Sequence, residues 1–378
     1  MKIGIVCYPT FGGSGVVATE LGLELSKRGH EIHFITYNQP VRLELLSNNV
    51  HYHEVTVPEY PLFHYQPYEL ALSSKLVDMV KLHDIEILHV HYAIPHAYAA
   101  YMAKKMLIEE GIYVPIVTTL HGTDITLVGS HPFYKPAVTF SINKSDAVTT
   151  VSQSLKDDTL RLFDIENEIT VVPNFIDLEK YNHGFTDCQR GMMANDNEKI
   201  ITHISNLRPV KRVQDVISVF YNIQKEIPAK LMFIGEGPEK EKVELRCREL
   251  GISNKVVFFG RSNEIDKILC FSDLFLLPSQ TESFGLAALE AMASGVPVIS
   301  SNTGGLPEVN IHGISGFLSN VGDVDDMTKN ALHILKDEST LKTFKNSARN
   351  EALKFDLHAI VPKYEAIYED TLNKCLVI

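Results

Sequence analysis

Residues 281–305 read TESFGLAALEAMASGVPVISSNTGG and decide the local fold of the second half of the chain. The run LAALEAMA (286–293) predicts one short helix, because its apolar residues recur at helical spacing. Gly295-Val296-Pro297 ends this helix, and Val298-Ile299-Ser300 has the pattern of a buried strand. The stretch therefore predicts a loop, a helix and a strand in immediate succession.

Two acids, Glu282 and Glu290, lie eight residues apart in this stretch. At a rise of ~1.5 Å per residue a fully helical spacing is about 12 Å, which is an upper limit because we expect Glu282 in the loop. This span suits two separated polyols, such as the ribose and the hexose of a nucleotide sugar. Backbone N–H groups around Phe284 and Gly285 supply further donors. The alternative is a capped, partly buried helix with two solvated acids.

The composition is that of an ordinary globular chain. It has 378 residues, 45% of them hydrophobic and 22% charged, which predicts about two domains. The net charge of -12 argues against a nucleic-acid binder or an anionic membrane as partner. No apolar run reaches ~18 residues and the start MKIGIVCYPT lacks a signal-peptide core, so we predict a cytoplasmic protein. The five cysteines form no CxxC pair, which favours a reducing compartment and no zinc site.

The first half of the chain begins with a strand, a glycine-rich loop and a helix. KIGIVCY (2–8) has the strand pattern, PTFGGSG (9–15) is the loop, and VVATELGLELSKRG (16–29) has helical spacing. Gly12 and Gly13 let backbone approach a phosphate, and Ser14 is placed to cap the helix or to contact a ligand. The row does not spell GxGxxG, and a merely tight turn explains it equally well.

Further strands follow in the first half. IEILHVHYA (85–93) is apolar almost throughout and predicts a central parallel strand. PIVTTLHGTDIT (115–126) runs a strand into a loop, so His121 follows a carboxyl end, where α/β folds place ligands. Eleven of the sixteen histidines lie in residues 1–172, but no HExxH spacing occurs. We therefore favour hydrogen bonding at strand ends over a metal site.

The second half repeats strand, turn and helix four times, which predicts a second parallel doubly wound sheet. The repeats are KIITHISNLRPVKRVQDVISVF (199–220), AKLMFIGEGPEKEKVELRCREL (229–250), VVFFGRSNEIDKILCFSD (256–273) and LFLLPSQTESFGLAALEAMA (274–293). We expect a first domain of residues 1–172 with a returning C-terminal helix at 358–378, and a second domain of 173–357. Residues 181–198 are polar and irregular, like a linker.

The turn NLRPVKR (206–212) gathers cations at a helix start. Asn206, Arg208, Lys211 and Arg212 lie here, and cations at a helix N-terminus oppose its dipole. A bound anion such as a pyrophosphate resolves that conflict, with Arg as a fork and Lys as a point charge. The alternative is a solvated helix start.

Taken together, these features resemble a retaining glycosyltransferase of family 4. The resemblance covers essentially the whole chain and rests on GGSG (12–15), HGTD (121–124), GEGPE (235–239) and ESFGLAALE (282–290) in order. It implies a GT-B fold: two Rossmann-like, doubly wound parallel-sheet domains facing across a cleft. The wording of CYPTFGGSGVVATELG (7–22) and TTLHGTDIT (118–126) is similar to the branch that transfers N-acetylglucosamine from UDP-GlcNAc to L-malate in bacillithiol biosynthesis.

The resemblance also implies roles for individual residues. Glu290 would hold the ribose hydroxyls, Glu282 the sugar hydroxyls, and Arg208 with Lys211 the pyrophosphate. The implied catalytic residues are His121, Arg208, Lys211 and Glu282. The other implied donor contacts are Gly13, Asn206, Arg261, Phe284, Gly285 and Glu290, with Arg261 near uracil. The implied acceptor contacts are Ser14, Tyr92, Thr119 and Asn174. His96 has no role that we can assign.

A DxD motif, Asp323-Val324-Asp325, occurs where a helix begins. Acids there cap the helix and complement its dipole, so we predict a cap, and no metal or other cofactor. The resemblance implies same-face attack on the sugar. A double displacement would need a carboxylate on the far face of the anomeric carbon, and we do not expect Asp124, the only first-domain acid in a suitable loop, to reach it.

Three other functions compete with this one. A UDP-GlcNAc 2-epimerase would need acid/base carboxylates near C2, and we find no such pair. A transferase acting on a lipid or polysaccharide would favour a basic first domain, whereas residues 1–172 hold 12 Lys and Arg against 19 Asp and Glu. An exported sugar-binding protein would need a signal peptide. The sequence leaves a homo-oligomer open.

Overall fold

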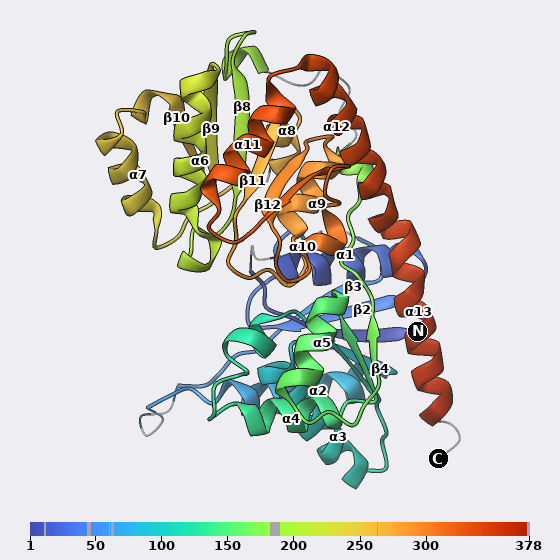
Figure 1. Cartoon of the computed structure of the whole chain (residues 1–378). Helices are drawn as coiled ribbons and strands as arrows, with labels where there is room; N and C mark the ends of the chain where they lie inside the picture. Colours follow the sequence, from blue (N-terminus) through green and yellow to red (C-terminus); the bar gives the residue numbers. More distant parts are fainter. Residues whose placement is uncertain are drawn as a thin grey trace. The chain divides into compact units, whose positions relative to one another are not determined.

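The computed structural model describes residues 1–10, 13–43, 47–59, 61, 64–181, 190–262 and 264–375. The chain forms two compact units (Figure 1). The first comprises Met1–Asn174 with His358–Ile378, and the second comprises Phe175–Leu357. The first boundary follows Asn174, two residues beyond the expected position at 172. The second boundary follows Leu357, which is the expected position. Residues 182–189, within the expected linker, lie outside the described residues.

The first unit is built on a seven-stranded parallel sheet in the order β3-β2-β1-β4-β5-β6-β7. Its strands are β1 (Lys2–Val6), β2 (Glu31–Thr36), β3 (Val50–Glu54), β4 (Ile87–His91), β5 (Ile116–Leu120), β6 (Ala147–Thr150) and β7 (Ile169–Val171). The order reverses between β1 and β4, which defines the switch point of a doubly wound sheet.

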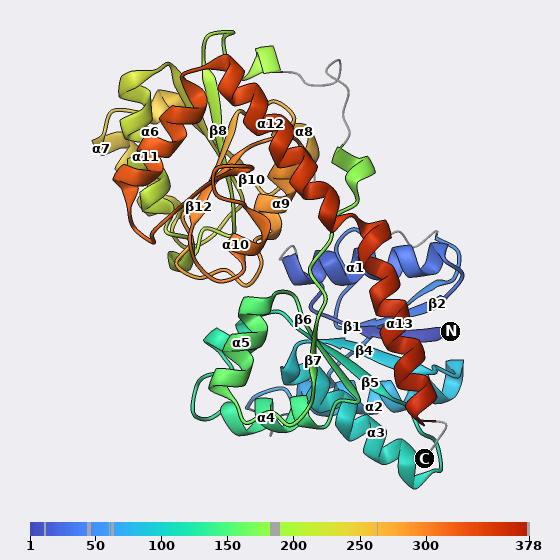
Figure 2. The ribbon, with the colours of Figure 1, turned by 45° about the vertical axis from the view of Figure 1, so that its right-hand side comes forward.

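Helices cover both faces of this sheet (Figure 2). They are α1 (Gly13–Lys27), α2 (Tyr68–His83), α3 (Tyr98–Glu109), α4 (Lys135–Asn143), α5 (Gln153–Leu162) and α13 (Leu357–Cys375), with helical turns η1 (Ala93–Ala97) and η2 (Thr123–Leu127). α2 and α3 pack together over a core that includes Val6, Ile35 and Val90. α13 returns from the end of the chain to the opposite face, where Tyr368 bonds His89 of β4.

The second unit has a six-stranded parallel sheet in the order β10-β9-β8-β11-β12-β13. Its strands are β8 (Lys199–Ile204), β9 (Ala229–Ile234), β10 (Val256–Gly260), β11 (Leu274–Leu277), β12 (Val298–Ser301) and β13 (Gly316–Ser319). The switch point lies between β8 and β11. Both units therefore have the doubly wound parallel sheet that the alternating strands and helices predicted.

The helices of the second unit are short except for three. They are α6 (Val213–Glu226), α7 (Lys240–Glu249), α8 (Ile265–Leu269), α9 (Leu286–Ala293), α10 (Leu306–Val309), α11 (Val324–Leu335) and α12 (Glu338–Ala352), with turns η3 (Leu178–Tyr181), η4 (Arg190–Met192), η5 (Pro209–Lys211), η6 (Ser253–Lys255) and η7 (Leu353–Phe355). α6 and α11 contact each other (Figure 1). The core of this unit includes Phe220, Phe233 and Ala331.

The strands that the sequence predicted best are buried on both faces. Every residue of β4, β5 and β11 is buried, because helices cover each side of a parallel sheet. β3 was not predicted: its sequence VHYHE is polar, and it forms the edge of the first sheet. An edge strand needs little apolar surface, so its sequence carries a weak strand signal.

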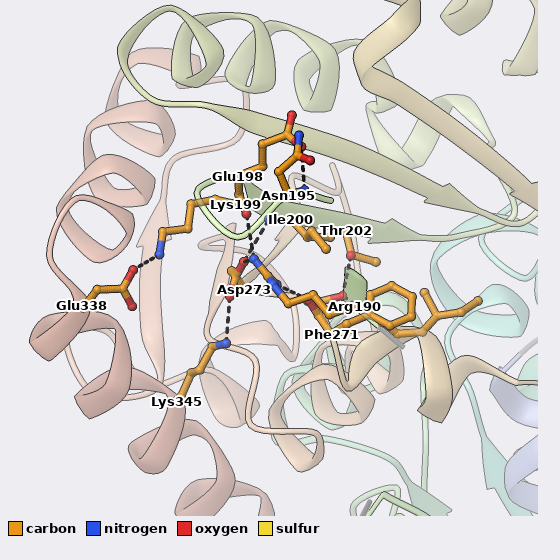
Figure 3. Close-up of polar contacts among 12 residues, drawn as sticks. Arg190, Asn195, Glu198, Lys199, Ile200, Thr202, Phe271, Asp273, Glu338 and Lys345 are labelled. Carbon is orange, nitrogen blue, oxygen red and sulfur yellow. Dashed lines mark hydrogen bonds and ion pairs between the residues drawn. The ribbon is translucent and has the colours of Figure 1, made fainter. Parts of the chain in front are cut away.

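A buried carboxylate anchors the second unit (Figure 3). Asp273 is 4% exposed and accepts hydrogen bonds from Arg190 at 2.8 Å, Lys345 at 2.9 Å and the Ile200 N–H at 2.9 Å. Burial raises the pKa of Asp273, but the two cations and the N–H group outweigh it and hold the pKa below its ordinary value. The carboxylate thus joins β8, α12 and the segment that precedes β8.

Among the described cysteines, Cys7, Cys247 and Cys375 are free, whereas Cys270 is disulfide-bonded, which the scattered spacing did not predict. Within the described part of the chain, no helix combines the length and the apolar character that a membrane span requires.

Candidate functional site

The predicted site residues gather at the switch point of each sheet. In the first unit the glycine loop follows β1, and Tyr92 follows β4. In the second unit Asn206 and Arg208 follow β8, and Glu282 follows β11. Ligands of open α/β sheets bind outside the carboxyl ends of the strands at this point. Within each unit the topology therefore brings together side chains that lie far apart in the sequence.

The glycine loop of the first unit folds tightly onto the end of β1. A Cβ atom at Gly15 would lie 2.5 Å from the carbonyl oxygens of both Tyr8 and Thr10, so only glycine fits there. Gly13 begins α1 and is exposed, so its N–H lies in the first turn, where N–H groups have no partner within the helix. The adjacent Gly12 lies outside the described residues.

Ser14 and Tyr92, both predicted acceptor contacts, are joined by a hydrogen bond of 2.6 Å between their hydroxyl groups. Tyr92 has φ 84° and ψ 137°, an unusual conformation for a residue with a side chain. Its ring packs against Tyr8 and against His121, with centroid distances of 5.1 Å to each. The backbone of Tyr92 thus holds its phenol beside the start of α1. Burial raises the pKa of Tyr92, so the phenol stays protonated.

His121 lies at the carboxyl end of β5 and bonds a second histidine. Its Nε2 is 2.8 Å from Nδ1 of His91, which ends β4. Burial lowers the pKa of His121 to about 3 and holds that of His91 well below its ordinary value. Both rings are therefore neutral at pH 7, and one donates an N–H to the other. The pair fixes the orientation of His121 without adding charge.

The carboxylate of Asp124 in the HGTD loop is hydrogen-bonded to backbone N–H groups. It is 2% exposed, and it accepts hydrogen bonds from the N–H groups of Ala93 at 2.9 Å, His121 at 3.2 Å and Gly122 at 3.0 Å. Burial raises its pKa to about 6, against the lowering effect of these N–H groups. Asp124 therefore ties the loop after β4 to the loop after β5.

Thr119 and Asn174, both predicted acceptor contacts, are buried. The Thr119 hydroxyl is fully buried between His89 and Thr149, at 2.7 Å from each, which counts against contact with an acceptor. Asn174 is 6% exposed, and its Oδ1 has no hydrogen-bond partner in the part of the chain that the structure describes. A buried amide with an open acceptor position is suited to a ligand hydroxyl.

His96, to which the sequence analysis assigned no role, packs beneath the residues that follow β1 and β4. Its ring is buried, its Nδ1–H donates to the His91 carbonyl at 2.6 Å, and it packs 4.6 Å from the Tyr8 ring. His96 thus positions the end of β4. Sequence reasoning also missed Tyr8, although its place directly after β1 at the switch point is a usable signal.

In the second unit the turn after β8 presents three cations: Arg208, and the paired Lys211 and Arg212, of which Arg212 has its Nε 2.6 Å from Oδ2 of Asp215. Arg208 is exposed and forms no ion pair with any residue that the structure describes. Lys211 ends η5, and its Nζ lies 2.6 Å from Oε2 of Glu282. Asn206 is exposed beside them, and Gly237 packs so tightly that a Cβ there would lie 1.9 Å from the Asn206 carbonyl oxygen. The GEGPE loop (235–239) therefore packs directly against the backbone of this turn.

Glu282 is held by the loop before α9. Ser279 donates to its Oε2 at 3.1 Å, and its carbonyl accepts the Gly305 N–H at 2.9 Å. A Cβ at Gly304 would lie 1.9 Å from that same carbonyl oxygen. The two glycines of NTGG thus let the β12 loop pack directly on Glu282, a contact that the sequence did not reveal.

α9 begins after Gly285, which has φ 100°, and Phe284 beside it is buried. Glu290 lies inside α9 and is 7% exposed. Its Oε1 accepts a hydrogen bond of 3.1 Å from the Tyr181 hydroxyl. Sequence reasoning missed Tyr181, because no local pattern links it to a residue 109 positions away.

Two predicted residues lie on separate elements. Arg261 directly follows β10 and is exposed. Asp323 caps α11, because its Oδ1 accepts the Asp326 N–H at 3.0 Å, so the predicted cap is confirmed. The acids of the DxD motif therefore serve the helix start.

Comparison with known proteins relates both units to glycosyltransferases. Residues 11–180 match "Glycosyltransferase Family 4", and residues 189–351 match "Glycosyl transferases group 1". Over 375 residues the chain is 47% identical to the N-acetyl-alpha-D-glucosaminyl L-malate synthase of Bacillus anthracis, covering 99% of this chain and 98% of that one.

Two solved structures share the fold. Anabaena HepE in complex with UDP and glucose has a TM-score of 0.82 at 20% identity, with 98% of this chain and 99% of that chain covered. Sucrose-phosphate synthase from Thermosynechococcus elongatus has a TM-score of 0.81 at 18% identity, with 99% and 100% covered.

Proposed function

This chain belongs to family 4 of the glycosyltransferases, and on that premise we propose that it transfers N-acetylglucosamine from UDP-GlcNAc to the hydroxyl of L-malate. Transfer proceeds with retention of the anomeric configuration. The support for this donor and acceptor is the Bacillus anthracis relative, whose name specifies an N-acetylglucosaminyl L-malate product. The reaction takes place in the cytoplasm as the first step of bacillithiol biosynthesis.

The observation that carries the donor assignment is the polar group around α9. Glu290 inside the helix binds the ribose hydroxyls, and Glu282 before it binds the hydroxyls of the transferred sugar. Arg208 and Lys211 take the pyrophosphate, and Arg261 lies near the uracil. The Lys211–Glu282 contact of 2.6 Å supports these assignments. It holds a cation for the phosphate beside a hydrogen-bond-accepting carboxylate for the sugar, at the point where phosphate and sugar are joined.

The departing UDP gains negative charge in the transition state, and preorganised cations stabilise that charge. Arg208 is exposed and has no ion-pair partner among the described residues, so binding a phosphate breaks no ion pair of its own. Lys211 already has its ammonium held by Glu282. The leaving phosphate oxygen accepts the proton of the attacking malate hydroxyl, so the reaction needs no carboxylate base.

The acceptor binds the first unit without a cluster of basic side chains. Ser14 lies at the start of α1, where the helix dipole favours a carboxylate, and the neighbouring Gly13 backbone is assigned to the pyrophosphate of the donor. Tyr92 adds a protonated phenol, and Asn174 an amide. His121 stays neutral and contributes a directed hydrogen bond near the reaction centre.

A UDP-release assay with UDP-GlcNAc and a panel of small acids tests the proposal. We expect release with L-malate and only background release with succinate, which lacks the hydroxyl. The product's anomeric proton, followed by NMR, should show the α configuration of the donor. Release that is equal with and without any acceptor would replace the transferase by a hydrolase or a 2-epimerase.

A metal-independent reaction is part of the proposal. Activity should survive EDTA, because Arg208 and Lys211 stabilise the leaving phosphate in place of a cation. The measurement is initial velocity with and without chelator, followed by addition of Mg²⁺ or Mn²⁺. A loss that only these ions restore would contradict the assignment of Asp323 as a helix cap alone.

One observation favours a second acceptor class. After the HGTD loop, Leu127 is 51% exposed, Phe133 87% and Tyr134 50%. Exposed apolar side chains that lie together mark a surface for contact with another molecule, and a lipid acceptor would suit it. Transfer of labelled N-acetylglucosamine to a lipid extract, with none to L-malate, would establish this alternative.

A further inference from the structure

Four histidines gather on one face of the first sheet, away from the site described above. His33 lies in β2, His51 and His53 lie in the edge strand β3, and His83 is the last residue of α2. His33 pairs with His51 in the parallel register, so alternate residues of the two strands point to the same side. The carboxylate of Glu31, the first residue of β2, lies on that side too.

The rings are in direct contact. Nδ1 of His33 lies 2.9 Å from Nε2 of His53, and the His83 ring centroid lies 4.6 Å from that of His33 and 4.8 Å from that of His53. One ligand nitrogen from each of His33, His53 and His83 falls within 4.8 Å of the other two. His33 is fully buried, and the other two rings are half-buried.

We propose that His33, His53 and His83 form a binding site for a divalent transition metal ion of the zinc type. Zn–N bonds of ~2.0–2.1 Å at a tetrahedral centre place two nitrogens about 3.3 Å apart. The His33–His53 separation of 2.9 Å therefore has to open by only a few tenths of an ångström around an ion. His53 lies in the edge strand β3 and His83 at the end of α2, and both rings are half-buried.

Glu31 completes the arrangement from outside. Its Oε1 lies 3.1 Å from Nε2 of His33, on the side of the ring opposite His53. With Nε2–H donating to this carboxylate, Nδ1 keeps its lone pair and faces His53. A ligating histidine commonly donates its other N–H to a carboxylate, which orients the ring and raises its basicity. Glu31 is thus a positioning residue for His33.

The chemistry of the ligands selects the ion. Three neutral imidazoles suit Zn²⁺, Cu²⁺ and Ni²⁺, whereas Mg²⁺ and Ca²⁺ require oxygen ligands. Lys75 of α2 is a nearby cation that opposes a metal. Glu31 offsets this charge.

The proposed ion has a structural role. β3 is an edge strand that pairs only with β2 in the described sheet, and a metal would join it to both β2 and the end of α2. A ligand that binds only the folded state raises the free energy of unfolding. The ligands lie on β2, β3 and the end of α2, whereas the candidate site residues Ser14, Tyr92 and His121 follow the ends of β1, β4 and β5.

The experiment uses the full chain, stripped with EDTA and dialysed. Zn²⁺ is titrated against a chromophoric chelator, bound metal is counted by mass spectrometry, and Tm is measured with and without Zn²⁺. We expect one equivalent of Zn²⁺ per chain, a higher Tm with Zn²⁺, and a d–d spectrum of tetrahedral type with Co²⁺. The variants are His53→Gln and His83→Gln, which leave the buried His33 in place, and Glu31→Gln.

Each histidine variant should lose the stoichiometric Zn²⁺ and the increase in Tm, and Glu31→Gln should weaken binding by about ten- to a hundred-fold. His131→Gln is the matched control, an exposed histidine of the same unit, and should bind Zn²⁺ like the parent. Circular dichroism without metal confirms folding of every variant. Equal Zn²⁺ uptake by the parent and the double variant His53→Gln/His83→Gln would overturn the proposal, as would no uptake by the parent.

Discussion

At the scale of single residues, the contact between Glu290 and Tyr181 sharpens the nucleotide assignment. The Tyr181 hydroxyl donates a hydrogen bond of 3.1 Å to Oε1 of Glu290. Glu290 is buried, with 7% of its surface exposed. Glu290→Gln replaces one accepting oxygen with a donating NH₂ group, so it cannot accept hydrogen bonds on both sides. We expect UDP affinity to fall five- to a hundred-fold, or about 1–3 kcal/mol, by calorimetry.

The control for this change is Glu241→Gln, an exposed acid in the first turn of α7. Its UDP affinity should match that of the parent. If Glu290→Gln binds UDP with unchanged affinity, this carboxylate is not part of the nucleotide site. The proposed order of ribose and sugar along α9 would then also be wrong.

A second change at this scale concerns Thr119. Its hydroxyl bridges His89 and Thr149 at 2.7 Å from each, in a fully buried position. Thr119→Val leaves both partners facing a methyl group. We therefore expect a loss of about 1–3 kcal/mol in the free energy of unfolding, measured by urea denaturation. If malate kinetics changed while stability did not, Thr119 would be an acceptor contact after all.

At the scale of elements, the loop after β12 fixes the position of Glu282. A Cβ at Gly304 would lie 1.9 Å from the Glu282 carbonyl oxygen, and this glycine has φ 56°. Gly304→Ala should therefore displace the loop and lower kcat/KM for UDP-GlcNAc by at least about ten-fold, the equivalent of ~1.4 kcal/mol.

The matched control is Gly313→Ala. Gly313 also has a left-handed backbone, with φ 76°, but a Cβ there meets nothing within 4 Å. Both variants share the cost of a left-handed alanine, and only Gly304→Ala adds the clash. Similar kinetics in the two variants would show that the clash does not reach Glu282.

The elements also show how far the sequence alone could lead. The apolar runs of β4, β5 and β11 predicted central strands, because burial on both faces demands continuous hydrophobicity. β3 was not predicted because its sequence VHYHE belongs to an edge strand, and the histidine cluster that includes it was therefore not predicted either. Motifs located most of the candidate site residues by position. Their pairing, such as Ser14 with Tyr92 and Lys211 with Glu282, arises only from tertiary packing.

At the scale of the whole molecule, the two units differ in their buried titratable groups. In the first unit, burial lowers the pKa of His89 and His121 to about 3 and that of His96 to about 4, and holds that of His91 well below its ordinary value. In the second unit, among the described residues, burial lowers the pKa of His203 to about 4. The ordinary histidine pKa is about 6.5, so these rings stay neutral in the folded state while the unfolded chain takes up protons.

This difference predicts that acid unfolds the first unit before the second. Between pH 6.5 and 4 the unfolded state binds more protons than the folded state, so the free energy of unfolding falls with falling pH. Each such histidine contributes up to about 1.4 kcal/mol per pH unit. Asp124 acts in the opposite direction, because its raised pKa of about 6 lets the folded state bind a proton first, but it is a single group against the four histidines named above.

Hydrogen exchange followed by mass spectrometry separates the two units, since the chain has no Trp to report on either. Peptides from residues 85–125 should lose protection between pH 6.5 and 4.5 at a pH where peptides from residues 199–234 keep theirs, after correction for the intrinsic pH dependence of exchange. His91→Gln should shift the loss in the first unit to lower pH, because a buried amide takes up no proton in either state. Simultaneous loss in both units would show that they unfold as one cooperative body, and that the buried histidines do not set the acid limit of the first unit alone.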